Sequence, residues 1–364
     1  MPKLSIQIIV YSKGEEKYIP YLFDSLARQT FQDWEMVVVD NASDGTVLST
    51  VEKHINELAK PYRIIKSGGN VGFAEGHNKG YASVKSDYVL LLNPDMYLMP
   101  DVLERMVEFL DKHTQASAVS TRLMRWDFSV VEDSQESELG KKAERGFTSA
   151  IDAIGIRLLR SRRSVECLAQ YRLAKDSDSK DVQKIFDKPA IEVFGISGAL
   201  PMFRKSSIDE LLLPGGKIFD PTYQSYKEDL DLAYRMRNAG YTSYIILDTK
   251  AYHDRTSAGP KSLSDFAAAR NKTKQSYYVR YHSYKNHIRT LIKNEYWQNF
   301  LLDSPFILWF ELKKFLYLLI TSPKVLFSGW REIIREWKYL MQARRVVHKS
   351  RKMYWKGIRR WFIV

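Results

Sequence analysis

Two uninterrupted apolar runs, each closed by polar turn residues, limit the folds open to this chain more than any other feature. Residues 36–39 read MVVV and end at Asp40, while residues 88–92 read YVLLL and end at residues 93–95, NPD. Apolar runs without polar alternation are typical of strands that are buried on both faces, as in a parallel sheet. We therefore expect both runs as central strands.

The rest of the first hundred residues alternates between strand and helix patterns. Residues 6–10 and 63–66 are apolar enough for two more strands, whereas residues 15–30, the segment through Val51 and the segment 103–110 have one apolar helical face each. This alternation predicts an α/β fold with a Rossmann-like, mostly parallel central sheet flanked by helices. Ligands bind such sheets at the carboxyl ends of the strands.

Two acids follow the second predicted strand. Asp40 and Asp44 could accept hydrogen bonds from a base or from ribose hydroxyls, but residues 41–45 could equally be a turn that begins the next helix. The segment 67–80 is rich in Gly and Asn and is expected as a loop that approaches a ligand closely or turns tightly. It lacks the G-x-G-x-x-G pattern of dinucleotide-binding proteins, which argues against hydride transfer.

Asn93 and Asp95 would present oxygen atoms to a hard divalent cation at the end of the fourth strand. Mg²⁺ and Mn²⁺ take one or two protein carboxylates and complete their shells with phosphates and water. Asp95 would supply the charged ligand and Asn93 a neutral one; the alternative is a plain turn with Asp95 in solvent. His253 follows a strand predicted at 242–247 and could be a metal ligand or a polar residue at a strand end.

Three acids cluster at the start of a helix predicted to end at Gly240. Glu228, Asp229 and Asp231 would favour the helix dipole there, and one of them could act as a general base on a hydroxyl group. Asp231 and Arg235 are four residues apart and could simply pair.

The composition changes along the second half of the chain. Residues 127–190 carry charge clusters without clear periodicity and are interpreted as an insertion that shapes substrate choice. We expect one domain over 1–270, with a nucleotide-binding half at about 1–120 and an acceptor half at 191–270. A helical extension would cover 271–364, where six of the eight Trp residues follow residue 296.

The extension is also basic. Residues 331–360 hold eleven Lys or Arg and two Glu, a net charge of +9 within an overall charge of +13. Nucleic acid and anionic lipid both attract such a segment. Apolar helical faces with basic flanks and Trp favour the membrane interface, and strand-end carboxylates would repel nucleic-acid phosphates, so no nucleic acid is expected as a partner.

Cysteine usage and hydropathy suggest a location. Cys167 is the single cysteine, which excludes an intramolecular disulfide and fits a reducing compartment. The start of the chain reads as a strand and not as a secretory signal, and no run of about eighteen uncharged apolar residues is present. We expect a cytoplasmic protein that associates peripherally with the cytoplasmic membrane.

Several stretches together resemble the family-two inverting glycosyltransferases with the GT-A fold. They occur in the expected order over roughly residues 4–290. The stretches are VVVDNASDGT (37–46), NVGFAEGHNKG (70–80), LLLNPD (90–95), GISGALPMFRKS (195–206) and FDPTYQSYKEDLDLAYRMRNAGY (219–241), followed by His253. The LNPD form and the stretch DAIGIRL (152–158) are most similar to the rhamnosyltransferase-like subgroup that builds bacterial surface polysaccharides.

This resemblance implies a nucleotide-diphosphate sugar as donor and a role for each matching residue. Asp40 would hold the base or ribose, with Asp44 supporting its loop. The residues expected to line the nucleotide-sugar pocket are Gly72, Phe73, Asn78, Gly198 and Ala199. Asn93, Asp95 and His253 would bind Mg²⁺ or Mn²⁺. Asp229 would deprotonate the acceptor hydroxyl, supported by Glu228, Asp231 and Arg235.

The expected reaction moves a sugar, with rhamnose as one candidate, to a saccharide hydroxyl on a polyprenyl-linked acceptor in polysaccharide synthesis. The extension would hold the enzyme at the membrane. Two alternatives stay open: a non-catalytic scaffold with the same fold, and a nucleic-acid binder acting through the basic tail. A nucleotidyltransferase would share the metal and nucleotide but release pyrophosphate.

Overall fold

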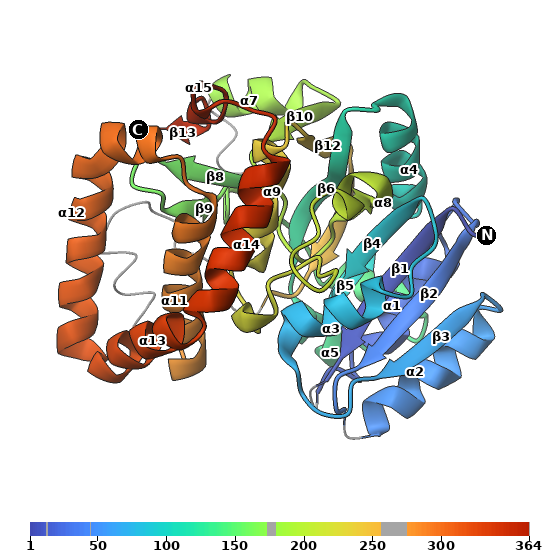
Figure 1. The fold of residues 1–364 in the computed structure, drawn as a ribbon. Helices are drawn as coiled ribbons and strands as arrows, with labels where there is room; N and C mark the ends of the chain where they lie inside the picture. The colour runs from blue at the N-terminus through green and yellow to red at the C-terminus, as the bar shows by residue number, and fades with distance from the viewer. Residues whose placement is uncertain (12–13, 44, 173–179, 256–274, 364) are drawn as a thin grey trace.

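A ten-stranded central sheet and a group of C-terminal helices make up the molecule (Figure 1). The computed structural model describes residues 1–363 except 12–13, 44, 173–179 and 256–274, so the predicted role of Asp44 lies outside the described residues. The strands run in the order β10-β12-β6-β11-β4-β1-β2-β3, with β5 paired to β12 and β7 to β6. Their bounds are β1 Leu4–Val10, β2 Trp34–Asp40, β3 Tyr62–Lys66, β4 Tyr88–Leu92, β5 Met96–Leu98, β6 Ala116–Trp126, β7 Phe147–Ala153, β10 Ala190–Val193, β11 Met202–Arg204 and β12 Thr242–His253.

The four strands expected from the first hundred residues are confirmed, and they are mutually parallel. Strand β1 pairs with β2 on one side and β4 on the other, and β3 pairs with β2. Strand β12 is parallel to β6, whereas β10 and β11 are antiparallel to their neighbours. The mostly parallel sheet flanked by helices agrees with the expected fold class.

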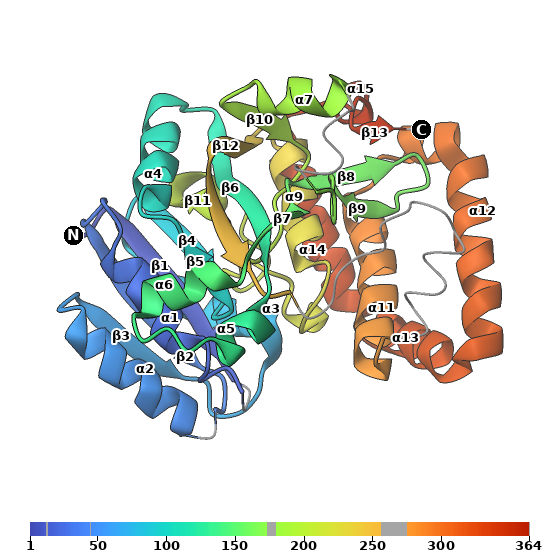
Figure 2. The same ribbon diagram turned by 180° about the vertical axis from the view of Figure 1, so that it is seen from behind.

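Helices cover both faces of the sheet (Figures 1 and 2). Helices α1 (Ile19–Ala27), α2 (Thr46–Glu57) and α4 (Val102–Lys112) bury their apolar sides in the cluster on one face. Helices α3 (Gly72–Tyr81), α8 (Lys205–Asp209) and α9 (Glu228–Asn238) contribute to the cluster on the other. The helix expected to end near Gly240 is α9, and Gly240 follows it with φ +86°.

The expected loop at 67–80 is wrong for most of its length, since residues 72–81 form helix α3. This helix lies directly on β1. A Cβ atom at Gly80 would come within 2.1 Å of the amide of Gln7, which is itself buried and bonded to the carbonyl of His77. Glycine here therefore provides close helix–strand packing, a use that composition alone does not distinguish from loop flexibility.

The insertion at 127–190 contributes to two sheets. It contains α5 (Phe128–Asp133), α6 (Leu139–Arg145) and α7 (Lys180–Phe186), and its strand β7 extends the central sheet beside β6. Strands β8 (Ile156–Leu159) and β9 (Ser164–Glu166) form a hairpin that β13 (Phe362–Ile363) completes from the end of the chain. The insertion and the C-terminal segment are thus joined by backbone pairing.

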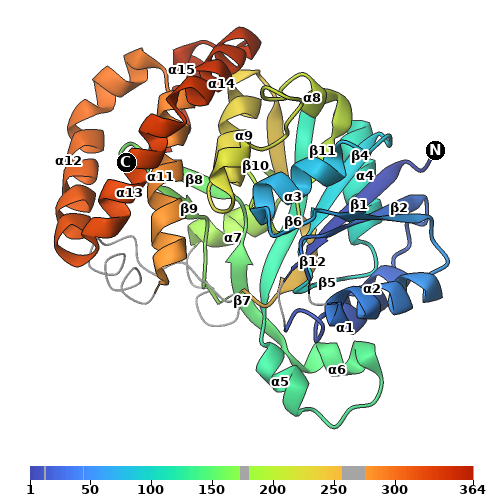
Figure 3. The ribbon, with the colours of Figure 1, turned by 60° about the horizontal axis from the view of Figure 1, so that its bottom comes forward.

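The expected C-terminal helices are present. They are α11 (Tyr277–Asn294), α12 (Trp297–Thr321), α13 (Pro323–Arg335), α14 (Trp337–Ser350) and α15 (Trp355–Arg359). Helix α11 packs against α9, α13 and α14, and α12 lies farthest from the central sheet (Figures 1 and 3). Of the helices described, none has the length and apolar content that a membrane crossing requires.

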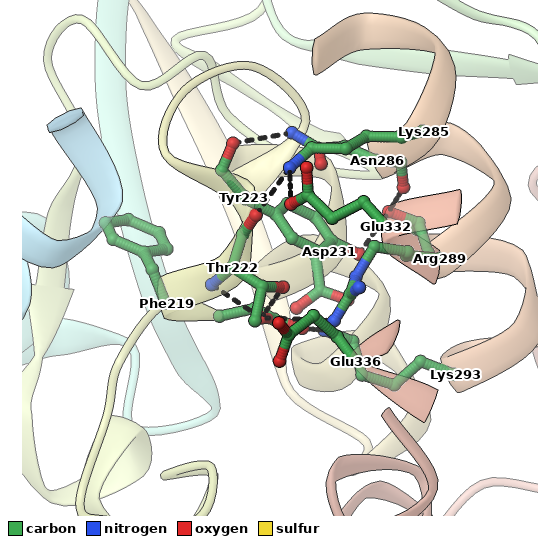
Figure 4. A network of polar contacts seen from close by, with 12 residues as sticks. Phe219, Thr222, Tyr223, Asp231, Lys285, Asn286, Arg289, Lys293, Glu332 and Glu336 are labelled. Carbon is green, nitrogen blue, oxygen red and sulfur yellow. Dashed lines mark hydrogen bonds and ion pairs between the residues drawn. The ribbon is translucent and has the colours of Figure 1, made fainter. Parts of the chain in front are cut away.

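A buried polar network joins α11 to α9 and to the segment that precedes α9 (Figure 4). The ammonium of Lys293 contacts Asp220 at 2.6 Å and Asp231 at 3.1 Å, and Asn294 donates to Asp231 at 2.7 Å. Asp231 also forms the predicted pair with Arg235, at 3.2 Å. We call Asp220, Asp231, Lys293 and their hydrogen-bond partners the junction. Because its charges are buried, loss of one partner would leave another uncompensated.

Candidate active site

The predicted nucleotide residues lie around the carboxyl end of β2. The Asp40 carboxylate accepts a hydrogen bond from the Ser43 amide at 2.8 Å, which is the turn that the alternative interpretation described. Asn41 accepts from the Val71 amide at 2.8 Å and so ties this turn to the start of α3. A contact between Asp40 and a base or ribose stays a prediction.

Three of the predicted pocket residues lie on α3, with different surroundings. Gly72 has φ +81°, and a Cβ atom there would come within 2.8 Å of the backbone oxygen of Gln224. Asn78 is buried, and its amide both donates to and accepts from the backbone of Phe219, at 3.0 and 2.9 Å. These two residues therefore fix α3 against the segment before α9. Phe73 is half-buried and lies beside Gly198, where it can face a ligand.

Strand pairing brings the predicted metal residues together. In the antiparallel pair of β5 and β12, His253 lies opposite Met96, the residue after Asp95. As a result, Nε2 of His253 is 3.4 Å from Oδ2 of Asp95, and its Nδ1 is 2.8 Å from Oδ2 of Asp152. Asn93 is half-buried in the same turn, and its backbone N–H donates to the carbonyl of Ala199 at 3.1 Å.

The two carboxylates control the charge of the imidazole. Burial by itself lowers the pKa of His253, but Asp95 and Asp152 outweigh burial and raise the pKa to about 9. Burial raises the pKa of Asp152, and His253, Arg255 and Arg125 more than offset it, so that the net shift is downward. The raised pKa favours the protonated imidazole of His253 at neutral pH.

The donor atoms fit a cation that takes few protein ligands. Asp95 offers a carboxylate and His253 an imidazole nitrogen at adjoining positions, and Asp152 can orient the ring through Nδ1 as carboxylates do for many metal-bound histidines. Metal binding at Nε2 would displace its proton. Among the residues that the structure describes, no three His, Cys, Asp or Glu side chains form a ready-made metal cluster, so substrate oxygens would have to complete the shell.

Asp152 and Glu166 were not predicted as site residues, and both come from the insertion. Arg255 lies between them, 3.8 Å from Asp152 and 3.3 Å from Glu166, and also donates to Ser197 at 3.1 Å. Burial raises the pKa of Glu166 to about 6, although Arg255 opposes the shift. Asp152 begins the DAIGIRL stretch, the one signal in the sequence that marked this part of the insertion.

The candidate base Asp229 is in the first turn of α9, next to the loop at 195–199. The Gly198 amide donates to its Oδ2 at 3.4 Å, and Oδ1 accepts from the Leu230 amide at 2.7 Å. Glu228 is buried, and burial together with Asp229 raises its pKa. The structure thus brings Phe73, Gly198 and Asp229 together, whereas Asp231 and Arg235 turn away into the junction.

A cavity of about 530 Å³ adjoins the base. Asp229 and Glu166 are part of its lining, together with residues from the β8–β9 hairpin, α11 and α12. The site therefore has carboxylates at the ends of parallel strands on one side and a partly open cavity on the other. An α/β protein with this arrangement can hold a ligand at the strand ends and present an acid or base to a second molecule.

A family model matches the first part of the chain. Residues 5–167 match the model described as "Glycosyl transferase family 2", the family that the motifs resemble. The relatives found are glycosyltransferases. An "Uncharacterized glycosyltransferase" of Haemophilus influenzae is 28% identical over 118 residues, which cover 32% of this chain and 36% of the relative.

A second relative matches over a longer stretch. The "N-acetylglucosaminyl-diphospho-decaprenol L-rhamnosyltransferase" of Mycobacterium tuberculosis is 23% identical over 292 residues, 77% of this chain and 85% of the relative. The chain spans about a third of the length of the first two curated relatives that it matches, 36% and 35%.

A solved structure supports the fold. "Crystal structure of GalNAc-T7 with UDP, GalNAc and Mn2+" superposes with a TM-score of 0.54 over 80% of this chain and 48% of the other, at 12% identity. The fold class expected from the sequence, a GT-A-like mostly parallel sheet flanked by helices with a helical C-terminal extension, is confirmed.

Proposed function

We propose that this protein is an inverting glycosyltransferase that moves a sugar from a nucleotide-diphosphate donor to a saccharide hydroxyl. One observation carries the proposal. The Gly198 amide donates to the Asp229 carboxylate, and the next residue, Ala199, accepts a hydrogen bond from the backbone amide of Asn93, which lies in the segment that matches the family 2 model. The base and the strand-end acids are therefore linked through one short loop. Asp40 would contact the base or ribose at the neighbouring strand end.

In the proposed reaction the acceptor hydroxyl attacks the anomeric carbon of the donor sugar in a single displacement. The new bond joins the acceptor oxygen to that carbon as the bond from the carbon to the diphosphate oxygen breaks. The hydroxyl proton passes to Asp229, and the diphosphate leaves with the bonding electrons. Since attack and departure take place on opposite faces, the configuration inverts. A positioned base typically contributes about 10²–10⁴-fold to such a step.

A divalent cation, Mg²⁺ or Mn²⁺, would be held by Asp95 and His253, with Asn93 as a neutral donor nearby. When bound, it would neutralise negative charge on the departing diphosphate. Asp152 would keep the His253 ring oriented, and Arg125 and Arg255 hold Asp152 in place at 3.3 and 3.8 Å. The solved glycosyltransferase with the same fold was crystallised with Mn²⁺, which supports the choice of metal class.

We further propose a lipid-linked acceptor and peripheral membrane binding through α12 and α13. The relative from Mycobacterium tuberculosis is named for a diphospho-decaprenol acceptor and for rhamnose transfer, which makes rhamnose a candidate sugar. Large apolar side chains are exposed along these helices, including Trp309 at 61%, Ile320 at 82%, Phe327 at 66% and Ile334 at 68%. An apolar surface of this kind, with Trp and Lys at its edges, suits a bilayer interface.

The basic tail is a weaker candidate for lipid or nucleic-acid binding than its composition suggested. At least six of its eleven basic side chains contact the protein itself. They are Arg335, Arg344, Arg351, Lys352, Arg359 and Arg360. Their charge is partly used within the fold, so the membrane proposal rests on the apolar face.

Nucleotide binding tests the enzymatic proposal most directly. Thermal unfolding would be measured with dTDP, UDP and GDP, each with Mg²⁺, Mn²⁺ or EDTA, because a ligand that binds only the native state raises its stability. We expect one nucleotide to stabilise the protein in a metal-dependent way, and Asp95→Ala to remove the metal dependence. Absence of any nucleotide effect on folded protein would favour the non-catalytic scaffold.

Liposome flotation tests the membrane proposal. We expect binding to vesicles that contain anionic lipid, and we expect the Trp309→Ser, Ile320→Ser double variant to lose it. A Lys338→Gln variant, which changes an exposed charge on α14, is the matched control and should bind like the native protein. Deletion of 297–364 is a poorer test, since it would also remove α13 and α14 from α11.

A further inference from the structure

The cavity beside Asp229 is formed by three parts of the chain that are distant in sequence. The β8–β9 hairpin of the insertion, the start of α9, and the extension helices α11 and α12 each supply part of its lining. Helix α9 lies nearest the central sheet and α12 farthest from it, with α11 in between (Figures 1 and 3). The space therefore extends from the candidate base toward the helix that carries the exposed apolar face.

The end of the cavity near α9 offers hydrogen-bond acceptors to a ligand. Asp229 lies there, and the Oε2 atom of Glu166 is buried without a hydrogen-bond partner among the residues that the structure describes. A buried carboxylate oxygen without a donor is costly unless a ligand supplies one. Saccharide hydroxyls are donors of the required kind.

Cationic side chains line the same space. Lys227 donates to Ser164 at 2.6 Å, Arg280 donates to Ser322, and Lys314 pairs with Glu311 at 2.7 Å. The Nε atom of Arg280 is buried and has no partner in the described part of the chain. Guanidinium and ammonium groups in a partly desolvated cavity are suited to phosphate oxygens.

The wall formed by α12 is apolar apart from Lys314. Phe310 and Leu318 face the cavity from this helix, and Ile363 of β13 closes another side. Other side chains of α12 form the exposed apolar face described above. A ligand bound in the cavity can therefore continue along apolar protein surface toward a membrane.

We propose that this cavity binds the acceptor as an isoprenoid diphosphate saccharide, with the sugar at Asp229 and Glu166, the diphosphate at Arg280, and the start of the isoprenoid chain against α12. This inference rests on the proposed function, whose acceptor it locates. The volume of about 530 Å³ matches a saccharide and diphosphate but not a long isoprenoid, because pockets of about 300–1,000 Å³ enclose only ligands of drug size. The remaining chain would lie outside, at the apolar face.

Calorimetric binding of farnesyl diphosphate to the full chain tests the inference without turnover. Inorganic diphosphate and farnesol separate the two parts of the probe, and UDP, GDP and dTDP report on the donor site. We expect farnesyl diphosphate to bind more tightly than either fragment. Arg280→Gln should weaken it about tenfold, as loss of one charge-assisted contact does, and leave nucleotide binding unchanged.

Two further variants keep the result interpretable. Lys338→Gln makes the same charge change away from the cavity and should bind farnesyl diphosphate like the native protein. Arg280→Lys keeps the charge and should bind more tightly than Arg280→Gln, which separates recognition from misfolding.

Three outcomes would overturn the inference: no binding of farnesyl diphosphate, farnesol binding as tightly as its diphosphate, or an equal loss of nucleotide affinity in Arg280→Gln. The last would place the cavity in the donor site. Failure of the proposed function is a different result, in which no nucleotide binds while farnesyl diphosphate binding still depends on Arg280.

Discussion

The first turn of α9 places two acids in opposite environments. Asp229 faces the loop at 195–199 and the cavity, and its carboxylate accepts hydrogen bonds from the backbone amides of Gly198 and Leu230. Asp231, two residues later, is buried in the junction against Lys293, Asn294 and Arg235. The same helix therefore carries one carboxylate that can act on a ligand and a second that is paired with buried groups of the fold.

The same contrast extends to the pKa shifts of the two regions. In the junction, burial raises the pKa of Asp220, but the nearby ammonium of Lys293 outweighs burial and the net shift is downward. Beside the junction, Lys285 lowers the pKa of Glu332 in the same way. Near the cavity, burial raises the pKa of Glu166 and Glu228, and their neighbours do not offset it. Charge compensation thus distinguishes the junction acids from the two acids beside the cavity.

Removal of Lys293 should have the largest effect on stability. Lys293→Met leaves Asp220 buried without its nearest cation, and breaking a buried pair in this way typically costs about 3–5 kcal/mol. Urea unfolding would measure the loss. Adding Asp220→Asn should recover part of it, and Lys338→Met, on the surface of α14, is the control. A loss below about 1 kcal/mol would mean that the junction contributes little.

Asp229→Asn should separate activity from stability. We expect sugar transfer to fall about 10²–10⁴-fold, because the amide cannot accept the proton, while the free energy of unfolding changes little. The assay would use the nucleotide sugar whose nucleotide stabilises the protein. Asp231→Asn is the comparison on the same helix and should lower stability more than it lowers the activity of the folded protein. Equal effects of both variants would contradict the division.

Asp152→Asn should weaken the metal site without changing its proposed ligands. Loss of a carboxylate that orients a ligating His typically lowers metal affinity about 10–100-fold. The Mn²⁺ concentration needed for stabilisation by the bound nucleotide would report the change. Asp133→Asn, an exposed acid of the same insertion, is the matched control. An unchanged Mn²⁺ requirement would contradict either metal binding by His253 or its orientation by Asp152.

Glu166→Gln should have a smaller effect that depends on pH. The pKa of Glu166 in the folded protein, about 6, lies above its ordinary value of 4.5, so the folded state binds the proton more tightly. Its contribution to stability is complete below about pH 4.5 and is lost as pH rises through 6, by about 1–2 kcal/mol. The variant should therefore gain stability relative to the native protein at pH 7.5 but not at pH 4.5.

Thermal or urea unfolding at the two pH values would detect this difference. The pH dependence of stability has the opposite sign for Asp220. Because the pKa of Asp220 is lowered in the folded protein, its contribution to stability is lost only as the pH falls below 3.8, the ordinary pKa of an Asp side chain. If the stability difference between Glu166→Gln and the native protein were the same at both pH values, the charge of Glu166 would be compensated like that of a junction acid.

The sequence allowed the strands and the order of the site segments to be predicted because both depend on local patterns. The apolar runs before Asp40 and Asn93 require burial on both faces, and their polar ends must then lie at one edge of a parallel sheet. The loop expected at 67–80 was wrong because glycine permits both flexible loops and close packing. Asp152 begins the DAIGIRL stretch, but that pattern did not assign its acid a role, and nothing near Glu166 in the sequence distinguishes a site acid from a surface acid.

By itself, the sequence determined the α/β fold, the strand ends that carry Asp40, Asn93 and Asp95, and the helical nature of the extension. The tertiary structure alone decided which acids are compensated. His253 meets Asp95 only through the register of β12 with β5, and Asp231 meets Lys293 only because α11 returns from about sixty residues away. Burial and pairing depend on such long-range contacts, which residue type and spacing do not encode.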